Sequence, residues 1–401
     1  MANTVYDSLY LKEVNLSGYK SIISVNLELQ KGLNIIIGKN AAGKTNFLSF
    51  LNKCISLEFQ DLNNFDSFLS FQNGKNITIE TNKNIKIEDL FKNSNLNLKV
   101  DSILKISGKE IKDKKGKSTT ISEKLIERNI YFDSSFLFHG IPTDYILINN
   151  PANWKFEKKK VSIDLSKIFR DSNNPYFLRC FALDLVLAVY HIDELTEKNI
   201  ENVLNNFFDR FSKLSEILSK YSPIQDFRVS DNFNIFIDEN KDSFSINNLF
   251  IEFKVDGQWL PFSNLSDGTK RLFYIISEIY DGYFNSDVRP TSSGFFISEE
   301  EVSRIILLEE PELGIHPHQF QKLMEFLQEE SEKKQIIITT HSPQALDAIN
   351  HKELHRIIIA YSTHDDGTKL RHLDKNELIK AADYLKEDFL SDYWLYSDLE
   401  K

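Results

Sequence analysis

The chain has 401 residues, of which 41% are hydrophobic and 27% are charged. The length predicts two to three domains, and the composition excludes an intrinsically disordered chain because it supplies enough apolar residues for a core. A net charge of −11 argues against a protein that coats nucleic acid over its whole surface. The charge is uneven: residues 1–170 hold 25 Lys and Arg against 18 Asp and Glu, whereas residues 171–401 hold 23 against 41.

The two cysteines, Cys54 and Cys180, lie far apart and lack Cys-x-x-Cys spacing. This excludes a disulfide scaffold and a cysteine zinc site, and it favours a cytoplasmic location. The N-terminus has no basic start followed by an apolar stretch, so we expect no signal peptide. The apolar stretches, such as residues 181–190, are too short to span a bilayer and carry a charge, so we expect no membrane segment.

In chain order, residues 8–37 alternate apolar and polar side chains and end in an apolar run, which predicts two strands and a buried third. Residues 44–58 place apolar side chains at helical spacing. Residues 60–130 are rich in Asn, Lys, Ser and Asp, which predicts an antiparallel insertion with long loops and a disordered tip at 108–120.

The second half of the chain mixes helical and strand patterns. We expect helices at 175–192, 196–221, 269–280 and 317–331, strands within 227–262, and central parallel strands at 304–308 and 335–339. A hairpin over 355–373 and a terminal helix complete the prediction.

The strongest local signal is GKNAAGKT, residues 38–45, which matches the phosphate-loop pattern GxxxxGK[ST] between an apolar strand and an amphipathic helix. The two glycines allow a tight turn with amides directed at phosphates, and the helix N-terminus adds positive charge. Lys44 is predicted to reach the β- and γ-phosphates of ATP, and Thr45 to hold Mg²⁺. The predicted ATP-binding residues are Gly38, Lys39, Asn40, Ala41, Ala42, Gly43, Lys44, Thr45 and Asn46.

An acidic partner follows the apolar run in RIILLEEPE, residues 304–312. Glu309 stands where a carboxylate, normally Asp, approaches Mg²⁺, and Glu310 stands where a general base orients the attacking water. The alternative is a solvated acidic turn before Pro311. The extra methylene of Glu309 leaves the Mg²⁺ geometry less defined.

Two further segments complete the pattern. LSDGTKR, residues 265–271, opens a helix that Ser266 can cap and where Gly268 allows an anion to approach the backbone. IIITTHSP, residues 336–343, puts His341 at a strand tip, where it either contacts a γ-phosphate or is only structural.

In order and spacing, these blocks resemble the ABC-type ATPase heads of the RecF, SMC and OLD group, closest to OLD-like "AAA family" ATPases. The resemblance implies an α/β fold: a P-loop NTPase of the ABC-head type with a mixed β-sheet, an antiparallel β subdomain and an inserted helical lobe. The corresponding divisions are a first head segment with the phosphate loop (1–60), an inserted region (61–226), a second head segment (227–350) and a C-terminal hairpin and helix (351–401).

The resemblance also implies a mechanism. ATP lies between two protomers, and Ser266, Asp267 and Gly268 of one act in trans on the nucleotide of the other, so we expect a dimer or higher oligomer. Glu310, Lys44 and His341 are the implied catalytic residues. Thr45 and Glu309 are the implied Mg²⁺ ligands.

About 60 residues follow His341, too few for the Toprim nuclease domain of OLD proteins. The resemblance then implies that the ATPase acts through a partner nuclease or toxin, as in the ATPase subunits of the PARIS, Septu and retron anti-phage systems. The alternative is a RecF-like DNA-repair ATPase that binds DNA through the basic region 101–170, with its clusters at 112–117 and 155–160, unless these are only solvated loops. A soluble motor for a membrane transporter is a third class.

Several assignments stay open from the sequence alone. Tyr19 is either an adenine contact or a core aromatic side chain. HDDG, residues 364–367, is either a metal cluster or a solvated turn. Gln60 and Gln72 are both candidates for the glutamine that ABC-type heads place near the metal. The segment 281–303 is longer than the usual link, and Thr269 departs from the usual signature residue.

Overall fold

The computed structural model describes residues 9–59, 61–72, 76–83, 101–111, 124–125, 131–137, 152–157, 196–202, 212–230, 233–240, 243–280, 288–290, 296–298, 302–386 and 389–396. The chain divides into two compact units. The first unit comprises Met1–His139, Glu301–Glu312 and Leu327–Lys401, and the second comprises Gly140–Glu300 and Leu313–Phe326.

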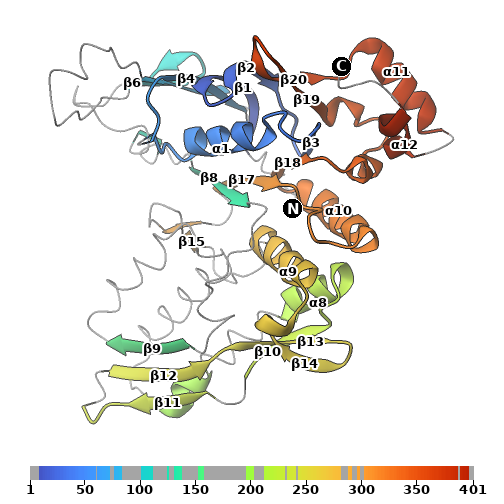
Figure 1. Cartoon of the computed structure of the whole chain (residues 1–401). Helices are drawn as coiled ribbons and strands as arrows, with labels where there is room; N and C mark the ends of the chain where they lie inside the picture. Colours follow the sequence, from blue (N-terminus) through green and yellow to red (C-terminus); the bar gives the residue numbers. More distant parts are fainter. Residues whose placement is uncertain are drawn as a thin grey trace, which may run out of the picture. The chain divides into compact units, whose positions relative to one another are not determined.

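One twelve-stranded sheet organises the first unit (Figure 1). Its order is β7-β6-β5-β4-β1-β2-β20-β19-β3-β18-β17-β8. The strands are β1 (Tyr10–Tyr19), β2 (Ile22–Glu28), β3 (Leu33–Ile37), β4 (Phe65–Gln72), β5 (Asn76–Lys83), β6 (Asp101–Ile106), β7 (Lys109–Glu110), β8 (Tyr131–Leu137), β17 (Val302–Glu309), β18 (Gln335–Thr340), β19 (Ile357–Thr363) and β20 (Gly367–His372).

The sheet is mixed. From β7 to β19 every neighbouring pair is antiparallel, whereas β19, β3, β18, β17 and β8 run parallel to one another. All residues of β3 and β18 are buried. Parallel strands covered on both faces need continuous apolar runs, which explains why the predicted central strands at 304–308 and 335–339 are confirmed in β17 and β18.

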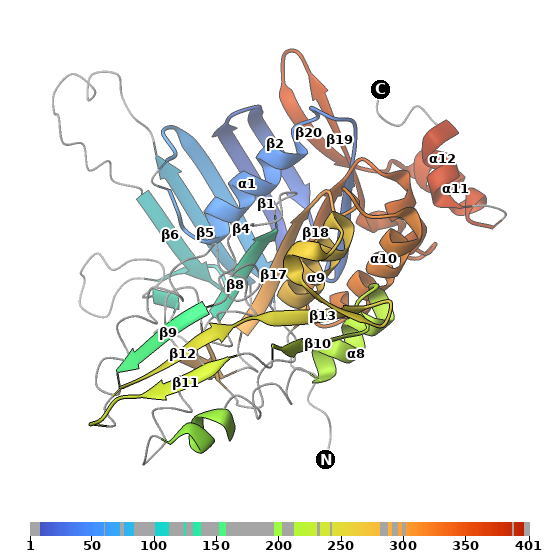
Figure 2. The ribbon, with the colours of Figure 1, turned by 60° about the horizontal axis from the view of Figure 1, so that its bottom comes forward.

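Helix α1 (Lys44–Ile55) follows β3 and lies across one face of the sheet, as Figure 2 shows. Its buried side chains, Phe47, Leu48, Phe50, Leu51, Cys54 and Ile55, join the core with apolar side chains of β1, β2, β4 and β5. The predicted helix at 44–58 is confirmed, and it ends at the Ser56 C-cap. The amphipathic pattern therefore holds the loop before α1 against the sheet.

The C-terminal part differs from its prediction in one respect. The hairpin is confirmed in β19 and β20, but two helices follow it, α11 (Lys375–Tyr384) and α12 (Leu390–Tyr396), where one was expected. Asp374 begins α11 with a complete capping box. The Ser391 amide donates to Asp347 Oδ1 at 2.8 Å, which satisfies a backbone donor in the first turn of the separate α12.

The second unit carries three small sheets with orders β10-β13-β14, β11-β12-β9 and β15-β16. Their strands are β9 (Ala152–Glu157), β10 (Asp226–Val229), β11 (Asn234–Ile237), β12 (Ser243–Leu249), β13 (Ile251–Val255), β14 (Gln258–Pro261), β15 (Val288–Pro290) and β16 (Phe296–Ser298). Helices α8 (Ser212–Tyr221) and α9 (Asp267–Ile279) belong to this unit. Phe253, Phe262 and Phe273 pack together, with ring centroids 4.8–6.0 Å apart.

The predicted helix at 269–280 is confirmed as α9, and that at 317–331 as α10 (Pro317–Ser331). The predicted helix at 196–221 is helical at its two described ends, and the one at 175–192 lies outside the described residues. Within the described part of the chain, no helix is long and apolar enough to cross a membrane.

Candidate functional site

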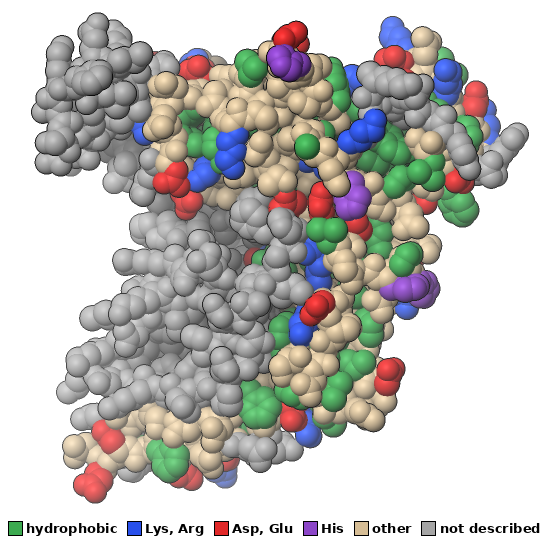
Figure 3. Space-filling view, in the orientation of Figure 1, with side chains coloured by type: hydrophobic (Ala, Val, Ile, Leu, Met, Phe, Trp, Pro, Cys, Tyr) green, Lys and Arg blue, Asp and Glu red, His purple; other side chains and the backbone are tan. Residues whose placement is uncertain are grey.

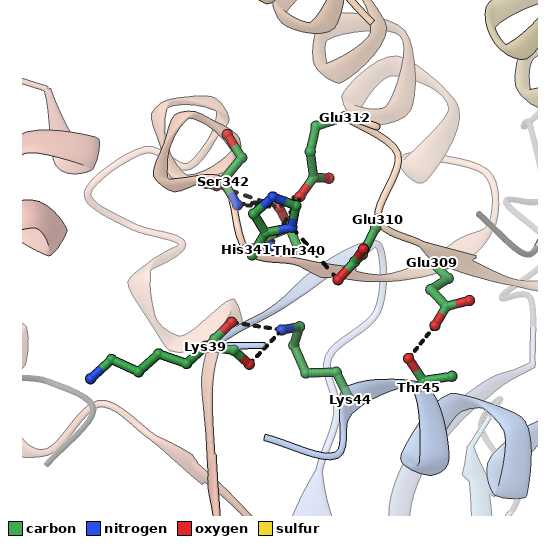
Figure 4. A network of polar contacts seen from close by, with 10 residues as sticks. Lys39, Lys44, Thr45, Glu309, Glu310, Glu312, Thr340, His341 and Ser342 are labelled. Atoms are coloured by element: carbon green, nitrogen blue, oxygen red, sulfur yellow. Dashed lines mark hydrogen bonds and ion pairs between the residues drawn. The ribbon is translucent and has the colours of Figure 1, made fainter. Parts of the chain in front are cut away.

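The phosphate loop turns sharply between β3 and α1. Gly43 has φ 88° and Ala41 has φ 66°, both in the left-handed region. Lys44 is buried, and its Nζ donates to the carbonyl oxygens of Gly38 at 2.6 Å and Lys39 at 3.0 Å (Figure 4). The ammonium group is therefore held inside the loop, where it can meet the negative charge of a phosphate.

The two loop glycines are also required by the sheet behind them. A Cβ at Gly38 would lie 2.1 Å from the Ala360 carbonyl oxygen, and one at Gly43 would lie 1.8 Å from Thr368 Oγ1. Thr368 is fully buried, and its hydroxyl lies 2.8 Å from Ser21 Oγ. The close fit of the loop against β19 and β20 is a constraint that the motif alone did not reveal.

The two predicted metal ligands meet. The Thr45 hydroxyl at the start of α1 donates a hydrogen bond to Glu309 Oε1 at the end of β17. Glu309 is 1% exposed. A hydroxyl and a carboxylate are the hard oxygen ligands that Mg²⁺ takes, so this donor set fits the ion. Glu309, whose side chain is one methylene longer than the usual Asp, reaches the Thr45 hydroxyl.

Glu310 directly follows β17 with an unusual backbone. Its φ is +41°, in the region that non-glycine residues rarely adopt. Its amide donates to the Thr339 carbonyl at 2.8 Å, which ties the turn to β18. Residues held in such sparsely populated backbone regions cluster at active sites and ligand clamps.

His341 comes directly after β18, and Figure 4 shows its ring between two carboxylates. Nδ1 lies 3.6 Å from Glu310 Oε1 and 3.1 Å from Glu312 Oε1. The structure therefore brings Lys44, Thr45, Glu309, Glu310 and His341 together at the carboxyl ends of three neighbouring parallel strands. Glu312 was not predicted. The sequence could have indicated it, because it is the third acidic residue of Glu-Glu-Pro-Glu at the end of a strand.

The predicted signature residues belong to the second unit. Ser266 caps α9, as predicted: its Oγ accepts from the Thr269 amide at 3.2 Å. Asp267 is exposed and pairs with Lys270 at 3.4 Å. A Cβ at Gly268 would lie 2.5 Å from the Gly314 carbonyl oxygen, so packing also requires glycine here.

The structure bears on two open assignments. Tyr19 stacks on Phe50 with centroids 4.9 Å apart, which favours the core role. His364 and Asp365 are almost fully exposed at the tip of the β19–β20 hairpin, which favours the solvated turn. Across the described ranges, no group of three or more His, Cys, Asp or Glu could hold a metal ion.

Other predicted features stay undecided. Gln72, at the end of β4, accepts from the Tyr10 hydroxyl at 3.3 Å, and Gln60 lies outside the described residues. The basic cluster 112–117 also lies outside them, as do residues 158–160 of the second cluster. On the face seen in Figure 3, acidic and basic side chains are interspersed over the described surface of the first unit.

Comparisons with known proteins agree with the phosphate-loop site described above. The family model described as "AAA domain, putative AbiEii toxin, Type IV TA system" matches residues 33–347. The "Retron Vc95 probable ATPase" of Vibrio cholerae is 22% identical, over 86% of this chain and 72% of that protein. The "Septu protein PtuA" of Bacillus thuringiensis is 24% identical, over 86% and 75%.

A "DNA replication and repair protein RecF" of Clostridium botulinum is 28% identical over 53% of this chain and 51% of that protein. A crystal structure of the Smc head bound to a domain of ScpA has a TM-score of 0.50 at 14% identity, over 92% of this chain and 99% of that one. The predicted ABC-head fold is therefore confirmed. The chain belongs to the AAA-domain family described above and is a P-loop ATPase with an SMC-like head.

Proposed function

We propose that this chain is the ATP-driven switch of a two-component anti-phage defence system in the bacterial cytoplasm. Its ATP-bound form dimerises, and hydrolysis controls a partner effector such as a nuclease or a toxin. The observation that carries the proposal is the cluster at the strand ends, where Lys44, the Thr45–Glu309 pair and the Glu310–His341 contact lie together.

The cluster contains the parts that in-line phosphoryl transfer to water requires. Lys44 compensates the charge of the β- and γ-phosphates, and Thr45 with Glu309 would hold Mg²⁺, which supplies further positive charge when bound. Glu310 orients the attacking water and accepts its proton. His341 contacts the γ-phosphate and reports its loss.

The signature segment completes the site from a second protomer. Ser266 marks the start of α9, and the positive N-terminal end of that helix would attract an anion. With Asp267 and Gly268, it would close over the nucleotide of the partner protomer in a two-fold dimer. ATP then joins the protomers, and hydrolysis separates them.

The choice of defence over repair rests on the relatives. The retron and Septu proteins each match 86% of this chain, whereas the RecF match covers 53%. The retron and Septu matches therefore extend over more of the chain than the RecF match does. Effector control is tested by co-expressing the product of the neighbouring gene with the wild-type, Lys44→Ala and Glu310→Gln chains. Effector activity that does not differ among the three would contradict the proposal.

The Glu310→Gln variant tests the switch itself. We expect it to bind ATP, to hydrolyse it about 10²–10⁴-fold more slowly, and to accumulate as an ATP-dependent dimer, because only proton transfer is lost. Light scattering coupled to size exclusion, with and without Mg·ATP, measures the dimer. Lys44→Ala is the control, since it should stay monomeric. Full turnover by Glu310→Gln would remove Glu310 from the base role.

The RecF-like alternative is favoured by two observations, the RecF match and the excess of basic residues in 101–170. It predicts DNA binding whose affinity falls steeply with salt. Replacing Lys112, Lys114, Lys115 and Lys117 by glutamine should then weaken binding and reduce the salt slope. Unchanged binding would contradict the DNA-clamp alternative.

A further inference from the structure

We infer that Glu312 is a positioning residue that holds both Glu310 and His341 in their working geometry. The inference rests on the proposed roles of those two residues. It concerns ATP turnover by the chain alone and is independent of any effector.

A single oxygen of Glu312 gathers the turn that follows β18. Oε1 accepts from the Thr340 hydroxyl at 2.7 Å, from the His341 amide at 3.0 Å and from the Ser342 amide at 3.3 Å. The same oxygen lies 3.1 Å from His341 Nδ1. Two consecutive backbone amides bound to one carboxylate fix the course of the chain at His341 (Figure 4).

The environment of Glu312 differs from that of Glu310. The Glu312 side chain is 10% exposed, whereas that of Glu310 is 23% exposed. Oε2 of Glu312 is buried and has no hydrogen-bond partner among the described residues. Because Oε1 is occupied by three donors and Oε2 is shielded, Glu312 is poorly placed to take a proton from water. The Glu310 side chain is the more exposed of the two, so Glu310 is assigned the role of general base and Glu312 the role of positioning residue.

Glu312 also supports the strained turn at Glu310. The Glu309–Glu312 turn is tied to β18 and its tip at two points: the Glu310 amide on the Thr339 carbonyl, and the Glu312 carboxylate on residues 340–342. A positive φ at a non-glycine residue persists only where its surroundings enforce it. Without the second tie, Glu310 is free to relax, and its carboxylate moves away from the position it needs.

The same carboxylate orients the His341 ring. Nδ1 lies 3.1 Å from Glu312 Oε1 and 3.6 Å from Glu310 Oε1, so a proton on Nδ1 would face both carboxylates and Nε2 would be the nitrogen left to meet the nucleotide. Loss of Glu312 would release the ring as well as the turn. Two catalytic groups would then be misplaced by one substitution.

The test compares Glu312→Ala with Glu312→Gln in steady-state ATP hydrolysis. Misplacing reacting groups by about 1 Å costs about 10²-fold, so we expect Glu312→Ala to lower kcat by about that factor and to leave KM nearly unchanged. An amide oxygen still accepts hydrogen bonds, so Glu312→Gln should recover most of the rate. Glu310→Gln is the matched control, because the same change at a base is not rescued.

A double-mutant cycle with His341→Ala checks the route of the effect. If Glu312 acts partly through His341, the two losses will be less than multiplicative. Fully multiplicative losses, a Glu312→Gln variant as slow as Glu310→Gln, or a Glu312→Ala effect confined to KM would each overturn the inference.

Should Glu312→Ala fold poorly, Thr340→Val replaces it, because this substitution removes one of the three hydrogen-bond donors to Glu312 Oε1. A smaller loss of kcat is then expected, and no loss of kcat would overturn the inference.

Failure of the proposed function gives a different result. A wild-type chain without turnover contradicts the ATPase switch. The role of Glu312 is then tested by a second measurement, the ¹⁵N spectrum of the protein with labelled histidine. The His341 signal in this spectrum is identified by its absence in the His341→Ala variant. An Nδ1–H state that Glu312→Ala changes supports the inference. An unchanged signal overturns it.

Discussion

At the scale of single residues, the loop glycine Gly43 serves two purposes at once. Gly43 adopts φ 88°, which a glycine allows at little cost, and its α-carbon lies directly in front of Thr368. Either constraint alone would favour glycine. Together they mean that the shape of the phosphate loop depends on a hairpin more than 300 positions away in the sequence.

The Gly43→Ala variant separates these two constraints. We expect this variant to lose more stability than backbone strain alone explains, because the new Cβ would lie 1.8 Å from Thr368 Oγ1. Backbone strain costs about 1–2 kcal/mol, and overpacking costs about 1–3 kcal/mol more. Gly257→Ala is the matched control, since φ is +78° there and nothing lies within 4 Å of the added Cβ. Urea unfolding of both variants measures the difference, and equal losses would refute the steric effect of Thr368.

Cys54 on α1 gives a pH prediction. Burial raises the pKa of its thiol from 9.0 to about 12, against a smaller opposing effect of the Ser67 hydrogen bond. The unfolded chain deprotonates first, so the folded state loses stability as pH rises above about 9. Between pH 9 and 10, we expect the wild-type protein to lose about 1 kcal/mol relative to Cys54→Ala. A pH-independent difference between their free energies of unfolding would show that the thiol is accessible.

At the scale of elements, α11 is fastened to the end of β20. Arg371 donates to both carboxylate oxygens of Glu377, at 2.7 and 2.9 Å. Glu377 also accepts from the Asp374 amide at 2.7 Å, which completes the capping box of α11. The Arg371 hydrogen bonds are the main reason why the pKa of Glu377 is lowered. The Glu377 side chain thus takes part in the cap of α11 and also attaches the helix to the sheet.

Glu377→Gln should therefore destabilise the protein by about 1–2 kcal/mol at pH 7. Because the pKa of Glu377 is lowered in the folded state, this stabilisation is present above the ordinary glutamate pKa and is lost as pH falls below about 4. Unfolding free energies measured from pH 7 to pH 3 should converge for wild type and variant. Asp383→Asn, in the exposed pair with Lys386, is the control and should change stability by less than about 0.5 kcal/mol.

At the scale of the whole molecule, the chain divides its motifs between two units. The cluster around Lys44 belongs to the first unit, and Ser266 with Gly268 belongs to the second. The first unit is assembled from three separate segments of the chain, because β18 pairs with β3 and β17 pairs with β18 in its sheet. The sequence-based division into 1–60, 61–226, 227–350 and 351–401 stays a prediction.

Subunit complementation tests whether the signature acts in trans. Lys44→Ala removes the phosphate contact, and Ser266→Arg blocks the signature, so each variant alone should be inactive. Mixed, they form a heterodimer with one intact site, made by the Ser266→Arg phosphate loop and the Lys44→Ala signature segment. We expect ATPase activity to return on mixing. Two variants that stay inactive at dimer-forming concentrations would contradict the trans arrangement.

The sequence alone was sufficient for the features that depend on neighbours a few positions apart. The apolar runs 304–308 and 335–339 predicted buried parallel strands, and the glycine pattern predicted the turn between β3 and α1. Because the carboxyl ends of neighbouring parallel strands meet at one sheet edge, the positions of Glu309, Glu310 and His341 at strand ends sufficed to predict their convergence.

Tertiary structure decided the contacts that join distant segments. The strand order sets β19 beside β3, and this alone brings Ala360 and Thr368 against the phosphate loop. The left-handed turn at Glu310 and the reach of Glu312 to the amides after β18 depend on how two strand ends fit together. No periodicity encodes such contacts, because they depend on which strand edges pair and how closely their turns pack. The sequence therefore determined which residues the candidate site was predicted to contain, whereas the tertiary structure determined how these residues are held.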